Sequence, residues 1–165
     1  MTTERLALWT WSPDDIDDVI ALHSDPRVTR FLTGADGKPW PEEEAHIRLA
    51  LWIEQHETRG YGKWKVMTRD GRFAGRAGIF DKEELDAIEL GFTIHPDLQG
   101  QGLATEVAAG IHDWAFANLT IDRLVAFSNP DNIASQRVLE KISMTFTHEG
   151  TLNALPWRFY QIARL

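Results

Sequence analysis

The segment Gln99-Gly-Gln-Gly-Leu-Ala-Thr-Glu106 has the residue types and spacing of a loop that binds an anion. Its two glycines let the backbone approach a ligand, and the loop precedes a predicted helix whose first amides have no partner within the helix. Free amides at a helix N-terminus suit a phosphate or pyrophosphate group. A plain strand-to-helix turn, in which glycine only provides tightness, fits the same spacing equally well.

Two well-known phosphate loops do not fit this segment. The P-loop requires Lys and then Ser or Thr after its last glycine, whereas Gly102 is followed by Leu103 and Ala104. The dinucleotide-binding fingerprint expects Gly or Ala at the position of Thr105, within alternating β-α units that this chain lacks. The segment therefore belongs to neither class.

Together with other segments, the loop resembles the GNAT superfamily of acetyl-CoA-dependent N-acetyltransferases. The pyrophosphate motif of that family, Gln/Arg-x-x-Gly-x-Gly/Ala, is matched in full by Gln99-Gly-Gln-Gly-Leu-Ala104. The wider pattern is similar to the branch of RimJ-type and RimL-type ribosomal-protein N-terminal acetyltransferases. Its segments occur here in the same order: Thr3-Glu4-Arg5-Leu6, Leu22-His-Ser-Asp-Pro26, Gly75-Arg-Ala-Gly78, Glu89-Leu-Gly-Phe92, His95-Pro96 and Asn132 to Lys141. The resemblance spans nearly the whole chain.

The resemblance implies that acetyl-CoA is the cosubstrate and assigns residues to it. The loop backbone would hold the CoA pyrophosphate through Gln99, Gly100, Gln101, Gly102, Leu103 and Ala104. The strand before the loop would pair with the pantetheine amides through Phe92, Thr93 and Ile94. Asn132 and Ser135 would face the pantetheine arm and the thioester. Arg137 and Lys141 are candidate helpers against the phosphates, and solvated charges on a helix face are an equal alternative.

Acetyl transfer to an amine benefits from a base, because an amine nitrogen must lose a proton to react. Glu89 is the first candidate, since it lies on the strand that ends at the loop and occupies the family's Glu-Ile-Gly-Tyr position. A glutamate that faces solvent or pairs with an arginine is the competing interpretation. Glu149 is a weaker second candidate for the base.

The departing thiolate, with an ordinary thiol pKa of about 8.5, needs only a modest proton donor. Many family members use a tyrosine seven residues after the motif asparagine, but Leu139 stands there in this chain. In the RimJ/RimL-like branch a serine three residues after the asparagine is the substitute, and Ser135 fills that place. A simple serine at a helix N-terminus is the alternative. Ser143 stands where the family usually has glycine, a change that could alter the turn after this helix.

The patterning around these residues predicts an α+β domain with a mixed, mainly antiparallel sheet flanked by helices. A change to period two from Gly62 onward predicts a meander of antiparallel strands, and the loop and its helix form one β-α-β crossover to a parallel strand. Predicted strands are Arg5–Trp11, Lys63–Thr68, Phe73–Phe80, Ala87–Ile94, Arg123–Ser128 and two in the tail near Phe146 and Phe159-Tyr160. Predicted helices follow Ser12-Pro13, Pro41, the Gly-rich loop and Asn132, and Thr33–Pro39 is a predicted loop. The helix after Pro41 should stop near Gly60, and the helix after Asn132 carries Ala134, Val138 and Ile142 at helical spacing.

Length and composition set further limits. The chain has 165 residues, which suits a single domain over 1–165, and a formal net charge of -8. This charge disfavours sequence-independent binding to nucleic acid and attracts cationic ligands. The chain contains no cysteine, which excludes a disulfide framework, a thiolate zinc site and a cysteine nucleophile.

Several other features carry expectations of their own. The six histidines match no metal-ligand spacing, so we expect no metal. No apolar run approaches the roughly 18 residues that cross a bilayer, and the first residues lack a signal-peptide pattern. We therefore expect a cytoplasmic protein without a membrane partner.

Trp52 and Trp114 occupy predicted core positions. Core packing is favoured over an acceptor groove for the remaining tryptophans, Trp9, Trp11, Trp40, Trp64 and Trp157.

The sequence thus leads to two functional hypotheses. The first is an acetyl-CoA-dependent N-acetyltransferase in which a primary amine, on a protein N-terminus or a small molecule, attacks the thioester directly. The absence of cysteine agrees with a mechanism that has no acyl-enzyme. The alternative is a catalytically silent acyl-CoA-binding module, which the missing tyrosine favours. The resemblance also implies that a homodimer could form.

Overall fold

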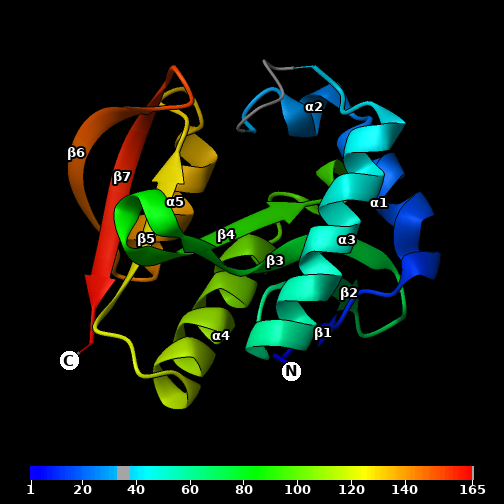
Figure 1. Ribbon diagram of the computed structural model, residues 1–165, viewed down its shortest axis with the longest axis horizontal. Helices are drawn as coiled ribbons and strands as arrows, with labels where there is room; N and C mark the ends of the chain where they lie inside the picture. Colours follow the sequence, from blue (N-terminus) through cyan, green and yellow to red (C-terminus); the bar gives the residue numbers. More distant parts are fainter. Residues whose placement is uncertain (33–37, 165) are drawn as a thin grey trace.

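A seven-stranded sheet organises the computed structural model of the protein, which describes residues 1–32 and 38–164 (Figure 1). The strand order is β1-β2-β3-β4-β5-β7-β6, and within the described chain β4 and β5 are the one parallel pair of neighbours. The predicted α+β class and mixed sheet are confirmed. The strands are β1 (Leu6–Trp9), β2 (Lys63–Thr68), β3 (Phe73–Lys82), β4 (Ala87–Ile94), β5 (Arg123–Ser128), β6 (Thr145–Leu152) and β7 (Leu155–Ala163).

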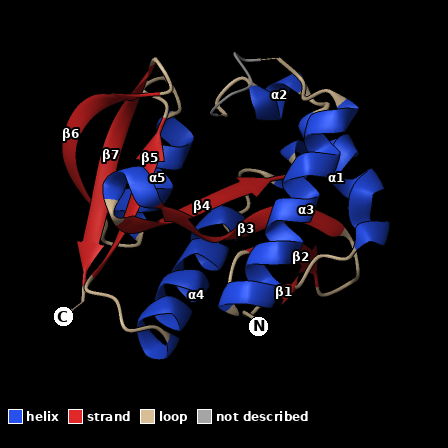
Figure 2. Cartoon of the chain, in the orientation of Figure 1, coloured by secondary structure: helices blue, strands red, loops and turns tan. Residues whose placement is uncertain are grey.

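Helices flank this sheet (Figure 2). They are α1 (Ile16–His23), α2 (Pro26–Thr29), α3 (Glu42–Arg59), α4 (Leu103–Asn118) and α5 (Ile133–Lys141), with short 3₁₀ turns at Pro13–Asp15, Glu83–Leu85 and Pro96–Leu98. Helix α3 ends where the sequence predicts, because Gly60 adopts the left-handed conformation that terminates helices. None of the helices in residues 1–32 and 38–164 has the length and apolarity needed to cross a membrane.

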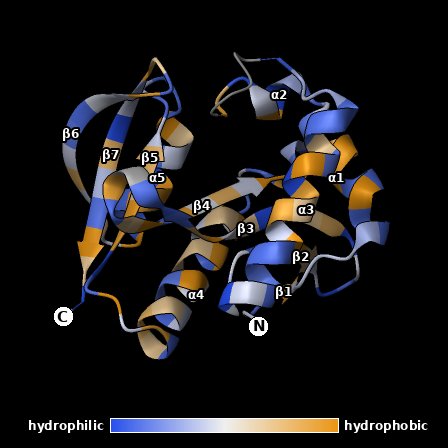
Figure 3. Ribbon diagram, in the orientation of Figure 1, coloured by the Kyte–Doolittle hydropathy of each residue, from blue (hydrophilic) through white to orange (hydrophobic). Residues whose placement is uncertain are grey.

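The two faces of the sheet carry separate hydrophobic cores. Ile79 belongs to the core that includes Val107 and Ile111 of α4. The adjacent Phe80 packs on the cluster that includes Trp52 of α3. Because neighbouring strand residues point to opposite faces, α4 covers one face, and α1 and α3 cover the other. Hydrophobic and hydrophilic residues alternate along α3, as expected for a helix with one buried side (Figure 3).

The predicted strand at Arg5–Trp11 and the predicted loop at Thr33–Pro39 are not reproduced in full by the described structure. The strand predicted over Arg5–Trp11 covers only Leu6–Trp9, because Trp11 leaves the sheet and is buried in the α1 and α3 core. The predicted loop at Thr33–Pro39 falls mainly on residues 33–37, which lie outside the described residues.

Helix α5 ends in a left-handed residue that is not glycine. Ser143 has a φ of 66°, and its N–H donates to the carbonyl of Glu140 at 3.0 Å. The N–H of Met144 donates to the carbonyl of Leu139 at 3.0 Å, which completes a Schellman motif. The serine therefore leaves the usual turn intact, at the cost of a strained backbone.

We expect Ser143→Gly to raise the free energy of unfolding by about 0.5–1 kcal/mol, because glycine adopts a positive φ without a Cβ clash. Urea denaturation measures the change. Ser24→Gly is the matched control, since Ser24 follows α1 with a right-handed φ of -82° and should lose stability instead. A Ser143→Gly protein no more stable than the wild type would contradict this account.

Candidate active site

A gap between β4 and β5 forms the site. Their parallel pairing covers only Ile88 with Leu124 and Glu89 with Val125. Beyond these pairs β4 continues beside β3 and β5 beside β7, and the two strands run apart (Figure 1). A cavity of about 440 Å³ is lined by the diverging segments 90–94 and 126–128. Main-chain groups on the facing edges are thus free to hydrogen-bond to a ligand.

The Gly-rich loop lies at the open end of this gap. Gly100 and Gly102 have φ values of 78° and 80°, which favour glycine. Gly102 is the N-cap of α4, and no side chain caps the helix. The loop and first helical turn line the cavity through Gln99, Gly100, Gly102, Leu103, Ala104 and Thr105. Their uncapped amides and the positive end of the helix dipole can hold a phosphate group there.

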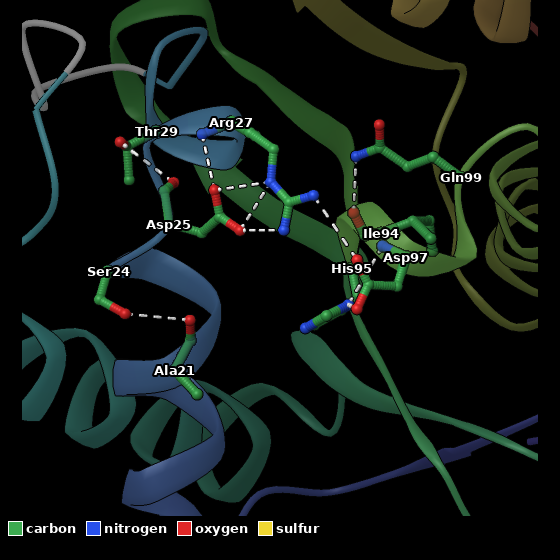
Figure 4. Close-up of polar contacts among 9 residues, drawn as sticks. All are labelled: Ala21, Ser24, Asp25, Arg27, Thr29, Ile94, His95, Asp97 and Gln99. Atoms are coloured by element: carbon green, nitrogen blue, oxygen red, sulfur yellow. Dashed lines mark hydrogen bonds and ion pairs between the residues drawn. The ribbon is translucent and has the colours of Figure 1, made fainter.

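The glutamine that begins the motif ties the loop to the end of β4. Gln99 Nε2 donates to the carbonyl of Ile94 at 2.9 Å (Figure 4). Phe92, Thr93 and Ile94 all line the cavity. One lone pair of the Ile94 carbonyl already accepts from Gln99, however. Gln101 is not among the lining residues, and its carbonyl accepts a hydrogen bond from Arg5 Nη1 at 2.8 Å.

Thr3 and Arg5, near the start of the chain, hold the first turn of α4 through contacts with Glu106. Glu106 Oε2 pairs with Arg5 Nε at 2.6 Å, and Glu106 Oε1 accepts from the Arg5 backbone N–H at 2.7 Å and from Thr3 Oγ1 at 2.5 Å. Burial acts to raise the pKa of Glu106, but the hydrogen bonds from Thr3 and Arg5 outweigh it and leave the pKa lowered. The family resemblance included Thr3 and Arg5 without giving them this role.

Helix α5 supplies the wall on the β5 side. Asn132 Oδ1 accepts from the backbone N–H of Ser135 at 3.1 Å and so caps the helix. Asn132 and Ser135 both line the cavity, and the Ser135 hydroxyl has no hydrogen-bond partner within the described chain. Ala134 and Val138, which share the predicted apolar face, line the cavity, and Val138 also packs against the core. The buried α5 side chains are Gln136 and Leu139, since this helix divides its faces between core and cavity.

Glu89 lies at the narrow end of the gap, where β4 and β5 still pair. It lines the cavity, and its carboxylate is 3.8 Å from Lys63 Nζ and 3.7 Å from Lys82 Nζ. The partners are thus two lysines and not the arginine considered from sequence. Burial lowers the pKa of Lys63 to about 8, although Glu89 acts in the opposite direction. A Cβ on Gly91 would lie 2.7 Å from Lys63 Nζ, so glycine makes room for this ammonium group.

An arginine and a histidine beside this site lie in segments of the family resemblance but were not predicted as site residues. Arg76 of β3 lines the cavity, and its Nε donates to His23 Nε2 at 3.0 Å. His23 is fully buried, stacks on Trp40 at 3.8 Å, and its Nδ1 lies 2.8 Å from the Val19 carbonyl. Burial and the neighbouring Arg76 lower the pKa of His23 to about 3, so its ring is neutral and accepts from Arg76. The signal in the sequence was a charged residue inside the glycine-flanked strand segment 75–78.

Of the other residues considered from sequence, three line the cavity and Glu149 does not. Glu149 is exposed on β6 opposite Arg158 and is not among the lining residues. Arg137 and Lys141 of α5 line the cavity. Trp157 lines it as well and is nevertheless buried. In residues 1–32 and 38–164, no group of three or more His, Asp or Glu side chains is arranged to hold a metal ion.

We expect Glu106→Gln to lower the free energy of unfolding at pH 7 by about 1–2 kcal/mol, because it weakens charge-assisted hydrogen bonds. The pKa of Glu106 is lowered in the folded state, so its contribution is present above the unfolded pKa and is lost as pH falls through the folded pKa. Urea titrations at neutral and acidic pH should therefore show the wild type and variant converging in acid. Glu57→Gln, at an exposed position of α3, serves as control and should change stability little. A difference that persists in acid would refute this explanation.

Solved structures share this fold over almost the whole chain. An acetyltransferase from Agrobacterium tumefaciens str. C58 superposes with a TM-score of 0.84 at 23% identity, covering 99% of this chain and 94% of that one. RimL, a ribosomal L7/L12 alpha-N-protein acetyltransferase solved in complex with coenzyme A, superposes with a TM-score of 0.81 at 18% identity, covering 99% and 96%.

Sequence comparison gives the family. The N-acetyltransferase YjdG of Bacillus subtilis (strain 168), itself uncharacterized, is 25% identical over 156 residues, which cover 91% of this chain and 92% of YjdG. A family model of the acetyltransferase (GNAT) domain matches residues 5–145, most of the chain. The uncapped helix, the glycine loop and the diverging parallel strands are accounted for together, because this chain belongs to the GNAT family of acetyltransferases.

Proposed function

We propose that the protein transfers an acetyl group from acetyl-CoA to a primary amine by direct attack in a ternary complex. The observation that carries this proposal is the β4 and β5 gap, with an uncapped helix N-terminus at its open end and Glu89 at its closed end. The gap exposes main-chain groups along the path from a phosphate site to a carboxylate. This arrangement suits an extended cosubstrate with an anionic head and a reactive end.

The donor residues present fit acetyl-CoA. The amides of Leu103, Ala104 and Thr105, with the glycines before them, would bind the pyrophosphate. The edge of β4 from Phe92 to Ile94 would bond to the pantetheine amides. Arg137 and Lys141 lie on the α5 wall and would add positive charge toward the phosphates.

The reaction needs two proton transfers beyond the binding of both substrates. The amine nitrogen attacks the carbonyl carbon of the acetyl thioester, an N–C bond forms and the C–S bond breaks. In our proposal Glu89 accepts the proton that the amine loses, and the two lysines beside it fix its carboxylate at the cavity wall. Ser135, whose hydroxyl has no hydrogen-bond partner in the described chain, would donate a hydrogen bond to the departing thiolate and relay a proton to it from solvent, so that the hydroxyl is restored.

Binding is tested first by thermal denaturation. Saturating acetyl-CoA, at about a hundred times its dissociation constant, should add about 2.7 kcal/mol and raise the melting temperature by about 5–10 °C. ATP at the same concentration is the control for general anion binding and should shift the melting temperature much less. Equal shifts with both ligands, or none with acetyl-CoA, would overturn the assignment of the loop.

Catalysis is tested with Glu89→Gln and Ser135→Ala in an assay of CoA release from acetyl-CoA and a panel of primary amines. Each variant should lose about tenfold or more in kcat, because a positioned acid or base contributes at least that much. The melting-temperature shift with acetyl-CoA should stay intact. Glu149→Gln, outside the cavity, is the matched control and should keep full activity. Unchanged kcat in a variant would remove that residue from the mechanism, and no CoA release with any amine would refute the proposed function.

A further inference from the structure

The residues that line the cavity carry an excess of positive charge, although the formal net charge of the chain is -8. Glu89 is the one acidic residue among the described lining residues, against five basic ones: Arg27, Arg30, Arg76, Arg137 and Lys141. Arg27 is already paired with Asp25 at 2.6 Å and with Asp97 at 3.5 Å (Figure 4). Arg137 and Lys141 stand on α5, on the side assigned to CoA. Arg76 and Arg30 therefore remain for another ligand.

We infer that the acceptor amine carries a carboxylate group and that Arg76 binds it. This inference rests on the proposed function and names the class of acceptor that the site takes. A guanidinium group binds a carboxylate through two parallel N–H bonds, which provides geometry as well as charge. Arg76 would be a specificity-determining residue, separate from the groups that move protons.

The contacts of Arg76 fix its direction and leave donors free. Its Nε donates to His23 Nε2 at 3.0 Å, and its guanidinium carbon lies 5.2 Å from the ring centre of Trp52. His23 is locked in turn by the Val19 carbonyl and by stacking on Trp40. Neither Nη atom of Arg76 has a hydrogen-bond partner among residues 1–32 and 38–164, and the side chain lines the cavity. The terminal N–H groups are thus available to a ligand.

The charge of Arg76 is only partly offset within the described structure, because Glu89 favours it from beyond ion-pair distance. No carboxylate there lies within 4 Å of it, and the imidazole of His23 is neutral. Glu89 is shared between Lys63 and Lys82. A cation removed from water without a close counterion is costly, and an anionic ligand group in contact with Arg76 would offset that cost.

The strand register places Arg76 where an acceptor would lie. Arg76 pairs with Thr93, two pairs away from Gly78 with Gly91, so both pairs share the sheet face that α1 and α3 cover. Glu89 is on the same face. The residue pair between Arg76 and Glu89 on this face is Gly78 with Gly91, and neither glycine has a side chain. The Lys63 ammonium lies 3.5 Å from the Gly78 carbonyl. The acceptor amine could thus approach the thioester with its carboxylate directed to Arg76.

The test compares acceptors that differ only in this charge. CoA release is measured for free amino acids against their carboxamides, and for short peptides with Asp against Asn at the second position, above the pKa of all the amines. At least one of these two sets should show a kcat/KM about tenfold or more higher for the carboxylate member. The set that responds distinguishes a free amino acid from an acidic N-terminus. Equal kcat/KM within both sets overturns the inference and leaves the proposed function standing.

Variants of Arg76 test whether this residue causes the preference for carboxylate acceptors over their amides. Arg76→Gln should bring the carboxylate-to-amide ratio down about tenfold to a hundredfold, mainly through KM, and Arg76→Lys should retain part of it. A purely structural role would lower both members of each pair alike and keep the ratio, which overturns the inference. Arg72→Gln, at an exposed turn between β2 and β3, is the matched control.

A binding measurement separates this inference from the proposed function. The wild-type protein saturated with CoA is titrated calorimetrically with the same pairs of compounds, without any turnover. Tighter binding of the carboxylate members, lost in Arg76→Gln, supports the inference even if no amine is acetylated. Equal binding, or none by either member, overturns it.

Discussion

The short pairing between β4 and β5 determines where the site lies, because the two strands are paired over only two residue pairs and then separate. A sheet normally satisfies its main-chain groups along the whole strand, and this separation leaves two facing edges unpaired. Each edge is supported from its other side, β4 by β3 and β5 by β7. The strands therefore stay ordered while a gap between them remains open, and residues from the loop, α2 and α5 meet around it (Figure 2).

Local charge in this gap differs from the charge of the molecule. The formal net charge of -8 led us to expect a cationic acceptor. The described lining has five basic residues and one acidic residue, and a buried lysine lies beside that acid. Charges close to a partly buried ligand are screened less than distant surface charges, so the local excess outweighs the overall balance. Both an anionic cosubstrate and an anionic group on the acceptor are consistent with such a wall.

Much of the fold could be predicted from sequence, because hydrophobic period and turn residues determine it locally. The strands from Lys63 to Ile94 and the end of α3 at Gly60 are examples. The loop at Gln99 was found because its glycines have a backbone role. The contact between Arg76 and His23 was not predicted, although both lie in segments of the family resemblance, because it joins residues 53 positions apart and leaves no periodic signal. The predicted apolar face of α5 holds at Ile142 and Val138, but the cavity beside Ala134 and Val138 was not predicted, because apolar residues line a cavity as readily as a core.

The contacts of Glu106 would link the proposed binding of acetyl-CoA to the order in which the chain folds. These contacts, with Thr3 and Arg5, span 103 and 101 residues. Closing so long a loop is entropically unfavourable until most other contacts exist, so this contact forms late. We infer that the first turn of α4, where we propose that phosphate binds, becomes rigid only after β1 has docked beside β2. Partly folded chains would present no organised phosphate site, and the cosubstrate would select and stabilise the fully assembled molecule.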